Sequence, residues 1–322
     1  MRALTWYFVI FAALAACIGM LALLIVLFEY PISLPASSSP PSSKQEEGKA
    51  LVIGLVPEYN VFEQRKRYRP LLAYLSTQLG ISMTLRSLPQ YHAVVEEMGQ
   101  DRLDGAFFGS YSYVVAHEKA GAAIIARPQW KDGISQYRGY LFTSTELGNI
   151  DVPAMKGLRL CLVSEHTTAG HLFPVKYFRQ HGVSDLSKYF GRIFYAGSHD
   201  AAILAVLNHE ADVGACKDTV YKALMQEHPE LKDKLRVFAE SEAVPSNGLA
   251  VSKRIDAQMR SRLENILLHM HESKEGRRVL DEFGAERFLL TTDADYRPVY
   301  DMANEIGAGF NPENLSASRP AK

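Results

Sequence analysis

Residues 103–112, LDGAFFGSYS, contain an apolar segment that runs directly into the first turn of a predicted helix. A short, largely apolar run is typical of a strand buried on both faces, and Gly109-Ser110 is a common kind of helix start. The same alternation precedes this segment, with predicted strands and helices in turn at residues 51–56, 68–79, 83–88 and 92–100. Repeated strand-helix units predict a parallel sheet covered by helices on both faces.

A second series of strands and helices begins after Lys156. Its predicted elements lie at residues 158–163, 168–180, 193–195, 198–207 and 211–215, followed by strand-like or helical segments at 235–238, 248–251, 257–272 and 274–283. Two α/β units joined by extended segments near Tyr140–Ser144 and near Ala239–Pro245 predict two lobes that face each other across a cleft. Because open α/β sheets bind ligands at the carboxyl ends of their strands, we expect the functional site in this cleft.

The predicted division of the chain follows from these two series. Lobe 1 comprises residues 50–142 and 243–312, and lobe 2 comprises residues 143–242. Residues 31–49 are rich in Pro, Ser, Gln and Glu and are predicted to be a disordered linker, since such a segment cannot bury enough apolar surface to fold. Residues 313–322 are predicted to be a disordered tail.

Residues 1–30 are predicted to be a transmembrane anchor or signal segment. Leu4–Phe28 is almost unbroken apolar sequence, and a helix needs roughly 20 such residues to cross a bilayer. Arg2 before the run and Glu29 after it favour an extracytoplasmic body. Leu14–Cys17 is similar to a bacterial lipoprotein cleavage box, so lipidation at Cys17 stays open beside the uncleaved anchor that we expect. Either way, the body is anchored at the extracytoplasmic or periplasmic face of the cytoplasmic membrane.

The composition excludes several classes of function. The 322 residues carry a formal net charge of −1, without the basic excess of nucleic-acid-binding proteins. Any anion site must therefore be local. Cys17, Cys161 and Cys216 have no metal-ligand spacing, and we expect neither a metal nor a cofactor. We interpret Cys161 and Cys216 as buried thiols, with a disulfide between neighbouring strands as the alternative in an oxidising compartment.

Three strand-to-helix junctions have the composition of an oxyanion site: Phe108–Ser112, His166–Gly170 and Gly197–Asp200. Each places hydroxyl groups and free backbone N–H groups at the start of a helix, where the helix dipole favours anions. A single junction of this kind is usually an ordinary helix cap. Three such junctions at strand ends in two facing lobes predict a binding site for an anion.

Fragments along most of the body resemble a known family in their order and spacing. They are Gly54–Tyr59, Leu103–Ser110, Thr167–Gly170, Gly197–Asp200, Leu204–Asn208, Ala211–Ala215, Val244–Asn247, Phe283–Gly284, Arg287–Phe288 and Asp293–Tyr296. Together they resemble the phosphonate-, phosphite- and phosphate-binding proteins of ABC transporters, within the type II periplasmic binding proteins. The resemblance implies an α/β, two-lobed fold with a parallel or mixed sheet in each lobe, to which the N-terminal transmembrane helix is added.

The resemblance also implies which residues contact the ligand. The predicted ligand-binding residues are Tyr59, Gly109, Ser110, Tyr111, Thr167, Thr168, Ala169, His199 and Asn247. Phe108, Ala169 and Asn247 stand where family members often have Tyr, Ser and Asp, so the exact oxyanion stays open. Lys217 and Asp218 could line the cleft, but we expect them to form a solvated pair.

By this resemblance the chain is a solute-binding protein that closes around phosphonate, phosphite or phosphate and delivers it to an ABC permease. We expect a monomer without enzymatic activity, because no nucleophile and base are paired in the predicted cleft. The alternative is a ligand-sensing input subunit for a membrane histidine kinase or cyclase.

Overall fold

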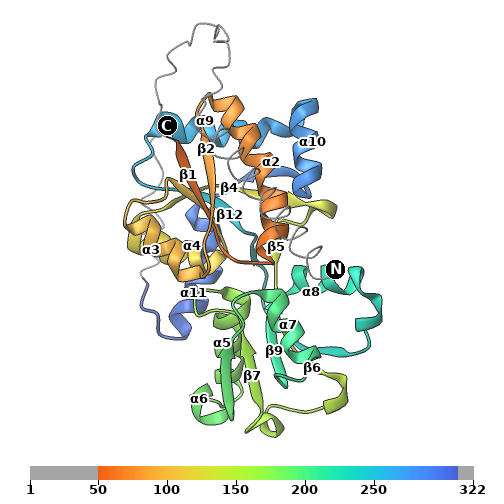
Figure 1. Cartoon of the computed structure of the whole chain (residues 1–322). Helices are drawn as coiled ribbons and strands as arrows, with labels where there is room; N and C mark the ends of the chain where they lie inside the picture. Colours follow the sequence, from red (N-terminus) through yellow and green to blue (C-terminus); the bar gives the residue numbers. More distant parts are fainter. Residues whose placement is uncertain (1–49, 311–322) are drawn as a thin grey trace, which may run out of the picture. The chain divides into compact units, whose positions relative to one another are not determined.

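The computed structural model of the protein describes residues 50–310 and contains two α/β lobes (Figure 1). The sheet of the first lobe has six strands. Their order is β13 (Ala285–Leu290), β4 (Ala123–Trp130), β12 (Gly248–Val251), β3 (Gly105–Phe108), β1 (Leu51–Leu55) and β2 (Met83–Ser87). Strands β1, β2 and β3 are parallel, whereas β12, β4 and β13 each run antiparallel to their neighbours, so the sheet is mixed.

Helices cover both faces of the first sheet. Residues of β3 alternate between the faces, with Phe107 in the core under three helices and Phe108 in the core on the other side. The three helices on the Phe107 side are α2 (Val61–Leu79), α9 (Ala257–His269) and α10 (Lys274–Phe283). On the other side, α3 (Tyr91–Gly99) and α4 (Ser110–Ala120) contribute to a core that continues into the second lobe.

Helix α2 begins seven residues before its predicted start at Tyr68. The Asn60 side chain caps it by accepting a hydrogen bond from the Phe62 N–H group (2.9 Å), and Gly80 ends it in a left-handed conformation. The first two turns carry mostly exposed polar and charged residues, so they lack the apolar periodicity that identified the rest of the helix.

The second lobe contains a five-stranded mixed sheet. Its order is β10 (Leu235–Glu240), β6 (Gly139–Ser144), β9 (Val213–Lys217), β7 (Arg159–Leu162) and β8 (Arg192–Tyr195). Strands β7, β8 and β9 are parallel, and β6 pairs antiparallel with both β9 and β10. The helices of this lobe are α5 (Phe173–Gln180), α6 (Leu186–Tyr189), α7 (His199–Leu207) and α8 (Asp218–Glu227).

Two short strands cross between the lobes. Strand β5 (Gln136–Tyr137) pairs antiparallel with β11 (Val244–Pro245), and Val244 lies opposite Tyr137. The expected crossing near Tyr140–Ser144 is therefore wrong, because those residues form β6 and are paired on both sides in the second sheet. The predicted lobe boundary between residues 142 and 143 falls inside this strand.

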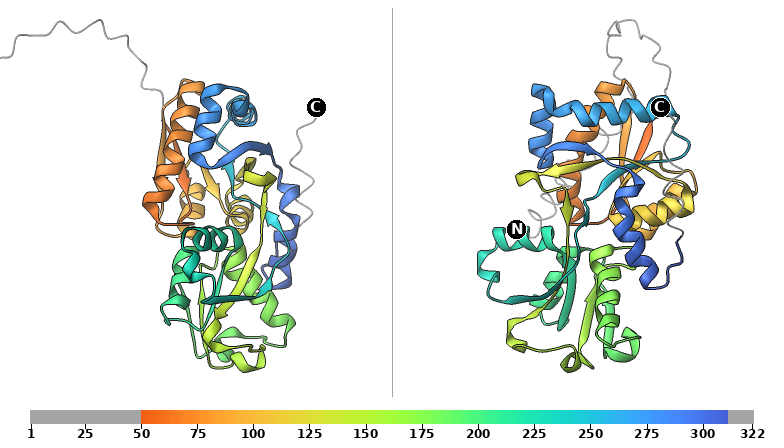
Figure 2. Two further views of the ribbon diagram at one scale, coloured as in Figure 1. Left: turned by 90° about the vertical axis from the view of Figure 1, so that its right-hand side faces the viewer. Right: turned by 180° about the vertical axis from the view of Figure 1, so that it is seen from behind.

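The last described helix, α11 (Arg297–Glu305), lies against both lobes (Figure 2). It packs on α4 of the first lobe and on α5 of the second. An ion pair between Lys176 Nζ and Glu305 Oε1 (3.0 Å) adds a polar contact to the second lobe. Like β4 and β13, this helix was not among the predicted elements.

The predicted anchor, linker and C-terminal tail lie outside the described residues. Among residues 50–310, no helix is long and apolar enough to span a bilayer. Cys161 and Cys216 are both buried free thiols, as expected, so they do not form the alternative disulfide. Burial raises the pKa of the Cys161 thiol to about 12, which keeps it protonated at neutral pH.

An aromatic cluster fills the core of the first lobe, beneath helices α2, α9 and α10. The buried Phe283 ring packs within about 6 Å of the rings of Tyr68 (5.0 Å), Trp130 (5.3 Å) and Phe288 (5.7 Å). Phe283→Ala should lower the free energy of unfolding by about 3–5 kcal/mol, measured by urea denaturation. Phe62→Ala, at a ring that is 75% exposed, should change it by less than about 0.5 kcal/mol. Equal effects of the two substitutions would contradict this assignment of the core.

Candidate ligand-binding site

The three predicted strand-to-helix junctions line one pocket between the lobes. Gly109 and Ser110 begin α4 in the first lobe, while Thr167 and Thr168 begin a π-helical turn that continues into α5 in the second. His199 begins α7, also in the second lobe. The first N–H groups of a helix have no intrahelical acceptor, so the junctions at α4 and at the π-helical turn can offer backbone donors to the pocket. At α7 the His199 backbone N–H group instead donates to the Glu58 carbonyl oxygen.

Ser110 connects the pocket to the crossing strands. Its Oγ lies 2.6 Å from the Tyr137 hydroxyl oxygen of β5 and 3.0 Å from the Pro245 carbonyl oxygen of β11, to which it donates. Ser110 is buried, and its position is therefore fixed by both strands that join the lobes. Burial raises the pKa of Tyr137, so its hydroxyl keeps its proton.

The two threonines differ in what they can offer. The Thr167 hydroxyl donates to the Ser164 carbonyl oxygen (2.6 Å) and is occupied locally. Thr168 Oγ1 is buried and makes no hydrogen bond of standard geometry within residues 50–310, although it lies near enough to the Tyr137 hydroxyl to act on the pKa of that group. The loop is tight here, since a Cβ atom on Gly170 would lie 2.7 Å from Thr167 Oγ1. Thr168 is thus a buried hydroxyl group in the pocket lining that is available to a ligand.

His199 is held as a neutral donor. Its Nδ1 accepts a hydrogen bond from the Lys217 backbone N–H group (3.1 Å), which puts the proton of the neutral ring on Nε2. Burial, followed by the nearby Lys217 charge, lowers the pKa of His199 to about 3. The ring can therefore donate one hydrogen bond from Nε2 without carrying a positive charge.

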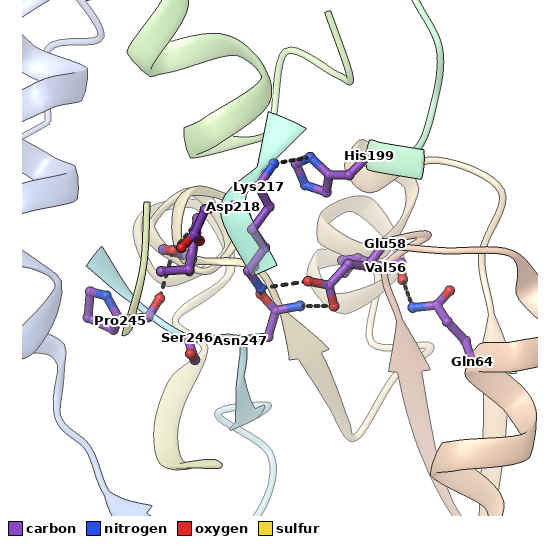
Figure 3. A network of polar contacts seen from close by, with 12 residues as sticks. Val56, Glu58, Gln64, His199, Lys217, Asp218, Pro245, Ser246 and Asn247 are labelled. Atoms are coloured by element: carbon purple, nitrogen blue, oxygen red, sulfur yellow. Dashed lines mark hydrogen bonds and ion pairs between the residues drawn. The ribbon is translucent and has the colours of Figure 1, made fainter. Parts of the chain in front are cut away.

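A buried ion pair joins the lobes beside these donors (Figure 3). Lys217 Nζ, from the end of β9, lies 2.6 Å from Glu58 Oε1, which follows β1. It also donates to Asn247 Oδ1 (3.2 Å) and lies 4.3 Å from the centre of the Tyr137 ring. Asn247 Nδ2 donates to the second Glu58 oxygen, Oε2 (2.8 Å). Burial is the largest influence and acts to lower the pKa of Lys217, but Glu58, Tyr59 and Tyr137 together outweigh it, and the pKa lies above its usual value.

Glu58 is directed into the pocket by its own loop. Its backbone N–H group donates to the Val56 carbonyl oxygen (2.9 Å), which closes a three-residue turn. The buried Gln64 side chain of α2 donates to the same carbonyl oxygen (2.9 Å) and holds this turn against the helix (Figure 3). The adjacent residue, Tyr59, lies instead beside Arg67, whose guanidinium carbon is 5.8 Å from the centre of the Tyr59 ring.

Six of the nine predicted ligand-binding residues line this pocket: Gly109, Ser110, Thr167, Thr168, His199 and Asn247. The other three do not line it. Tyr59 is beside Arg67, the Tyr111 ring packs against Phe310, and Ala169 is buried in the core. Their role in ligand binding stays a prediction, as it does for the six.

Sequence reasoning missed Glu58, Tyr91 and Tyr137, and it misjudged Lys217. The expected solvated pair of Lys217 and Asp218 is wrong, because both side chains are buried and have different partners. Asp218 accepts from the Arg138 backbone N–H group (2.9 Å) and pairs with Lys222 (2.7 Å). Glu58 and Lys217 each stand at or just after the carboxyl end of a strand, and that position was the available signal.

Little space remains among the side chains of the central pocket. Its cavity has a volume of about 10 Å³, roughly that needed by one water molecule. A larger cavity of about 310 Å³ adjoins it and shares Tyr91 and His166 with its lining. The outer cavity is also lined by Glu165 and Tyr195 from the second lobe. An anion can reach the central donors only if the lobes or the ion pair move.

A pocket between two α/β lobes, lined by helix N-termini from both, defines a two-lobed solute-binding protein. A family model described as the periplasmic substrate-binding protein of phosphonate ABC transporters matches residues 53–296, which is most of the chain. The chain belongs to this family. The predicted family and the two-lobed α/β fold are thereby confirmed.

Individual relatives agree with this assignment. The phosphate-import protein PhnD of Mycolicibacterium smegmatis is 26% identical over 319 residues, covering 92% of this chain and 96% of the relative. The phosphonates-binding periplasmic protein of Escherichia coli is 23% identical over 268 residues, covering 82% of this chain and 78% of the relative. A solved structure of PhnD1 from Prochlorococcus marinus in complex with methylphosphonate shares the fold. It superposes with a TM-score of 0.72 at 24% identity, covering 80% of this chain and 98% of that one.

Membership of the family settles the class of function. The protein is an extracytoplasmic solute-binding component that works with an ABC permease, and it is not an enzyme. Transport is therefore favoured over the sensory alternative.

The neutral state of His199 predicts a pH dependence of stability. Its native pKa lies below the unfolded value near 6.5, so protons bind preferentially to the unfolded chain. The stabilisation from the neutral ring is complete above about pH 6.5 and declines toward pH 3, by about 1.4 kcal/mol for each pH unit. Between pH 7 and pH 5, wild type should therefore lose about 2 kcal/mol more stability than His199→Gln in urea denaturation.

His269→Gln supplies the matched control for this measurement, because His269 is exposed on α9. It should retain the pH dependence of the wild type. The assignment is wrong if His199→Gln also retains it, or if NMR titration places the pKa of His199 near that of a solvated imidazole.

Proposed function

We propose that the protein captures a small phosphate-like oxyanion, namely a phosphonate, phosphite or phosphate, between its lobes and delivers it to an ABC permease. The observation that carries this proposal is the pocket into which both lobes direct the start of a helix. The printed names of the relatives support the ligand class, since they describe import of phosphate and binding of phosphonates.

The donors proposed to hold the oxyanion are neutral. Backbone N–H groups at Gly109–Ser110 and at the start of the π-helical turn would meet its oxygens, together with Thr168 Oγ1 and His199 Nε2. Neutral, preorganised donors in a buried site can stabilise an anion strongly, because they need no reorganisation and are shielded from water. This arrangement accounts for anion binding by a chain of net charge −1.

Hinge closure is the proposed mechanism of capture. The second lobe would bind the anion first through Thr168 and His199, and the first lobe would add Ser110. Contacts between the lobes accompany closure: the His199 N–H group donates to the Glu58 carbonyl oxygen (3.4 Å), and the Asn60 N–H group donates to Asp200 (3.3 Å). The ligand would stabilise the closed state through contacts that the open state lacks.

We further propose that the apolar segment at residues 1–30 anchors the body at the membrane and that residues 31–49 act as a flexible linker to the permease. Lipidation at Cys17 would serve the same purpose. The protein would act as a monomer, because a two-lobed site needs no second copy to complete it.

Thr168→Val tests the proposed site. Full-length protein in detergent should show a higher thermal midpoint with methylphosphonate, phosphite or phosphate, and the rise should grow with the ratio of ligand concentration to Kd. Thr168→Val should weaken binding by about tenfold or more, the value of one hydrogen bond to a charged ligand, and leave the unliganded midpoint nearly unchanged. That midpoint should change little because the hydroxyl makes no hydrogen bond of standard geometry among the described residues.

Thr143→Val is a matched control, since Thr143 Oγ1 is likewise buried without a partner in the described structure but lies in β6, away from the pocket. It should bind as wild type does. If both substitutions weaken binding alike, or if none of the three anions shifts the midpoint of the wild type, the proposed site is wrong.

A further inference from the structure

We propose that the site takes its oxyanion as a protonated monoanion, with the ligand hydroxyl donating to Glu58 or to Asn247 Oδ1. This inference rests on the proposed function and specifies the ligand further. Glu58 is then a specificity-determining residue that selects ligands by the proton they carry. Phosphonate, phosphite and phosphate monoanions have an acidic O–H group, whereas sulfate has none at neutral pH.

The charges that line the pocket balance one another. Glu58 and Lys217 are its only carboxylate and ammonium groups, and they pair with each other at 2.6 Å. Two histidines also line the pocket. His199 is neutral because its Nδ1 already accepts the Lys217 backbone N–H group, and burial lowers the pKa of His166, which keeps that ring neutral as well. A dianion would therefore enter a pocket without net positive charge and stand beside a carboxylate, which a buried site penalises strongly.

Two side chains around Glu58 donate hydrogen bonds to its carboxylate, so Glu58 acts only as a hydrogen-bond acceptor in the pocket. Lys217 from β9 and Asn247, next to β12, donate to its two oxygens, and the hydroxyl-bearing rings of Tyr91 from α3 and Tyr137 from β5 line the same pocket. Tyr59 and Tyr68 also lie close enough to Glu58 for its charge to act on them, and burial raises the pKa of all four tyrosines. Burial lowers the pKa of His166 in the same lining, so Lys217 is the cation that pairs with Glu58.

Spare acceptor capacity is what a protonated ligand requires. A carboxylate has about four lone-pair sites, and the described contacts of Glu58 use one on each oxygen. Asn247 Oδ1 has accepted one bond, from Lys217. Neither group can donate through these atoms, so an unprotonated ligand oxygen placed there would meet lone pairs only. A site built around such an acceptor binds analogues without the O–H group much more weakly, because the buried acceptor is then left without a hydrogen-bond donor.

The test measures Kd by titration calorimetry for the full-length protein in detergent. Methylphosphonate is titrated at several pH values that span its second ionisation. If only the monoanion binds, its apparent Kd should rise tenfold for each pH unit above the second pKa of the ligand. At a pH below that pKa, sulfate and dimethylphosphinate, a monoanion without an O–H group, should bind at least about 100-fold more weakly than methylphosphonate.

Glu58→Gln should remove the selection. The carboxamide can turn its Nε2 donor toward a bare oxygen, so the pH dependence should flatten, and the sulfate-to-methylphosphonate Kd ratio should fall toward one. Because both readouts are ratios within one variant, an overall loss of affinity does not disturb them. Glu63→Gln, the same substitution at an exposed position in the first turn of α2, should keep the wild-type pH dependence and ratio.

The pH dependence of Kd in the wild type tests the selection of a protonated ligand even if Glu58→Gln does not fold. A pH-independent Kd for methylphosphonate, or sulfate binding within tenfold of it, would overturn the selection of a protonated ligand and leave the proposed function standing. Retention of the pH dependence in Glu58→Gln would overturn the role of Glu58. Failure of every oxyanion to bind would overturn both proposals.

Discussion

The ion pair between Lys217 and Glu58 is the contact around which the two lobes meet. Both side chains are less than a tenth exposed, so each has lost most of its hydration. Their attraction, the Asn247 hydrogen bonds and the Tyr137 ring offset that loss. Because one partner follows β1 and the other ends β9, the pair forms only when the lobes are together. On opening, water can solvate both charges again, so closure can be reversible at small net free energy.

The same lysine determines how the rest of the pocket treats charge. Its backbone N–H group fixes the His199 tautomer, and its ammonium group disfavours a second positive charge nearby. The remaining donors are hydroxyl groups and helix N-termini, whose partial charges act over short distances. An anion in this pocket is therefore recognised by the direction and number of its hydrogen bonds, and general electrostatic attraction contributes little.

Much of the fold could be predicted because many of its strands and helices are specified by the residues within each segment. The strands β1, β3 and β7, the later turns of α2 and the helices that follow β3 and β7 have apolar periodicity, and the three junctions have helix-start composition. β4 carries Arg127 and Pro128 in its second half, which obscures its strand pattern. Its partner β13 lies more than 150 residues away, and its pairing stabilises both strands. α11 likewise depends on distant contacts with α4 and α5.

In the candidate site, too, the residues placed by local sequence patterns could be predicted, and those that depend on distant partners could not. Helix N-termini at strand ends are properties of the backbone, so local patterns located Ser110, Thr168 and His199. Glu58 and Lys217 are 159 residues apart and acquire a function only as partners. Either residue alone, after an apolar strand, looks like an ordinary solvated charge. The shared fold thus accounts for an oxyanion site, while the protonation state that the site accepts depends on a long-range pair of side chains that no local pattern specifies.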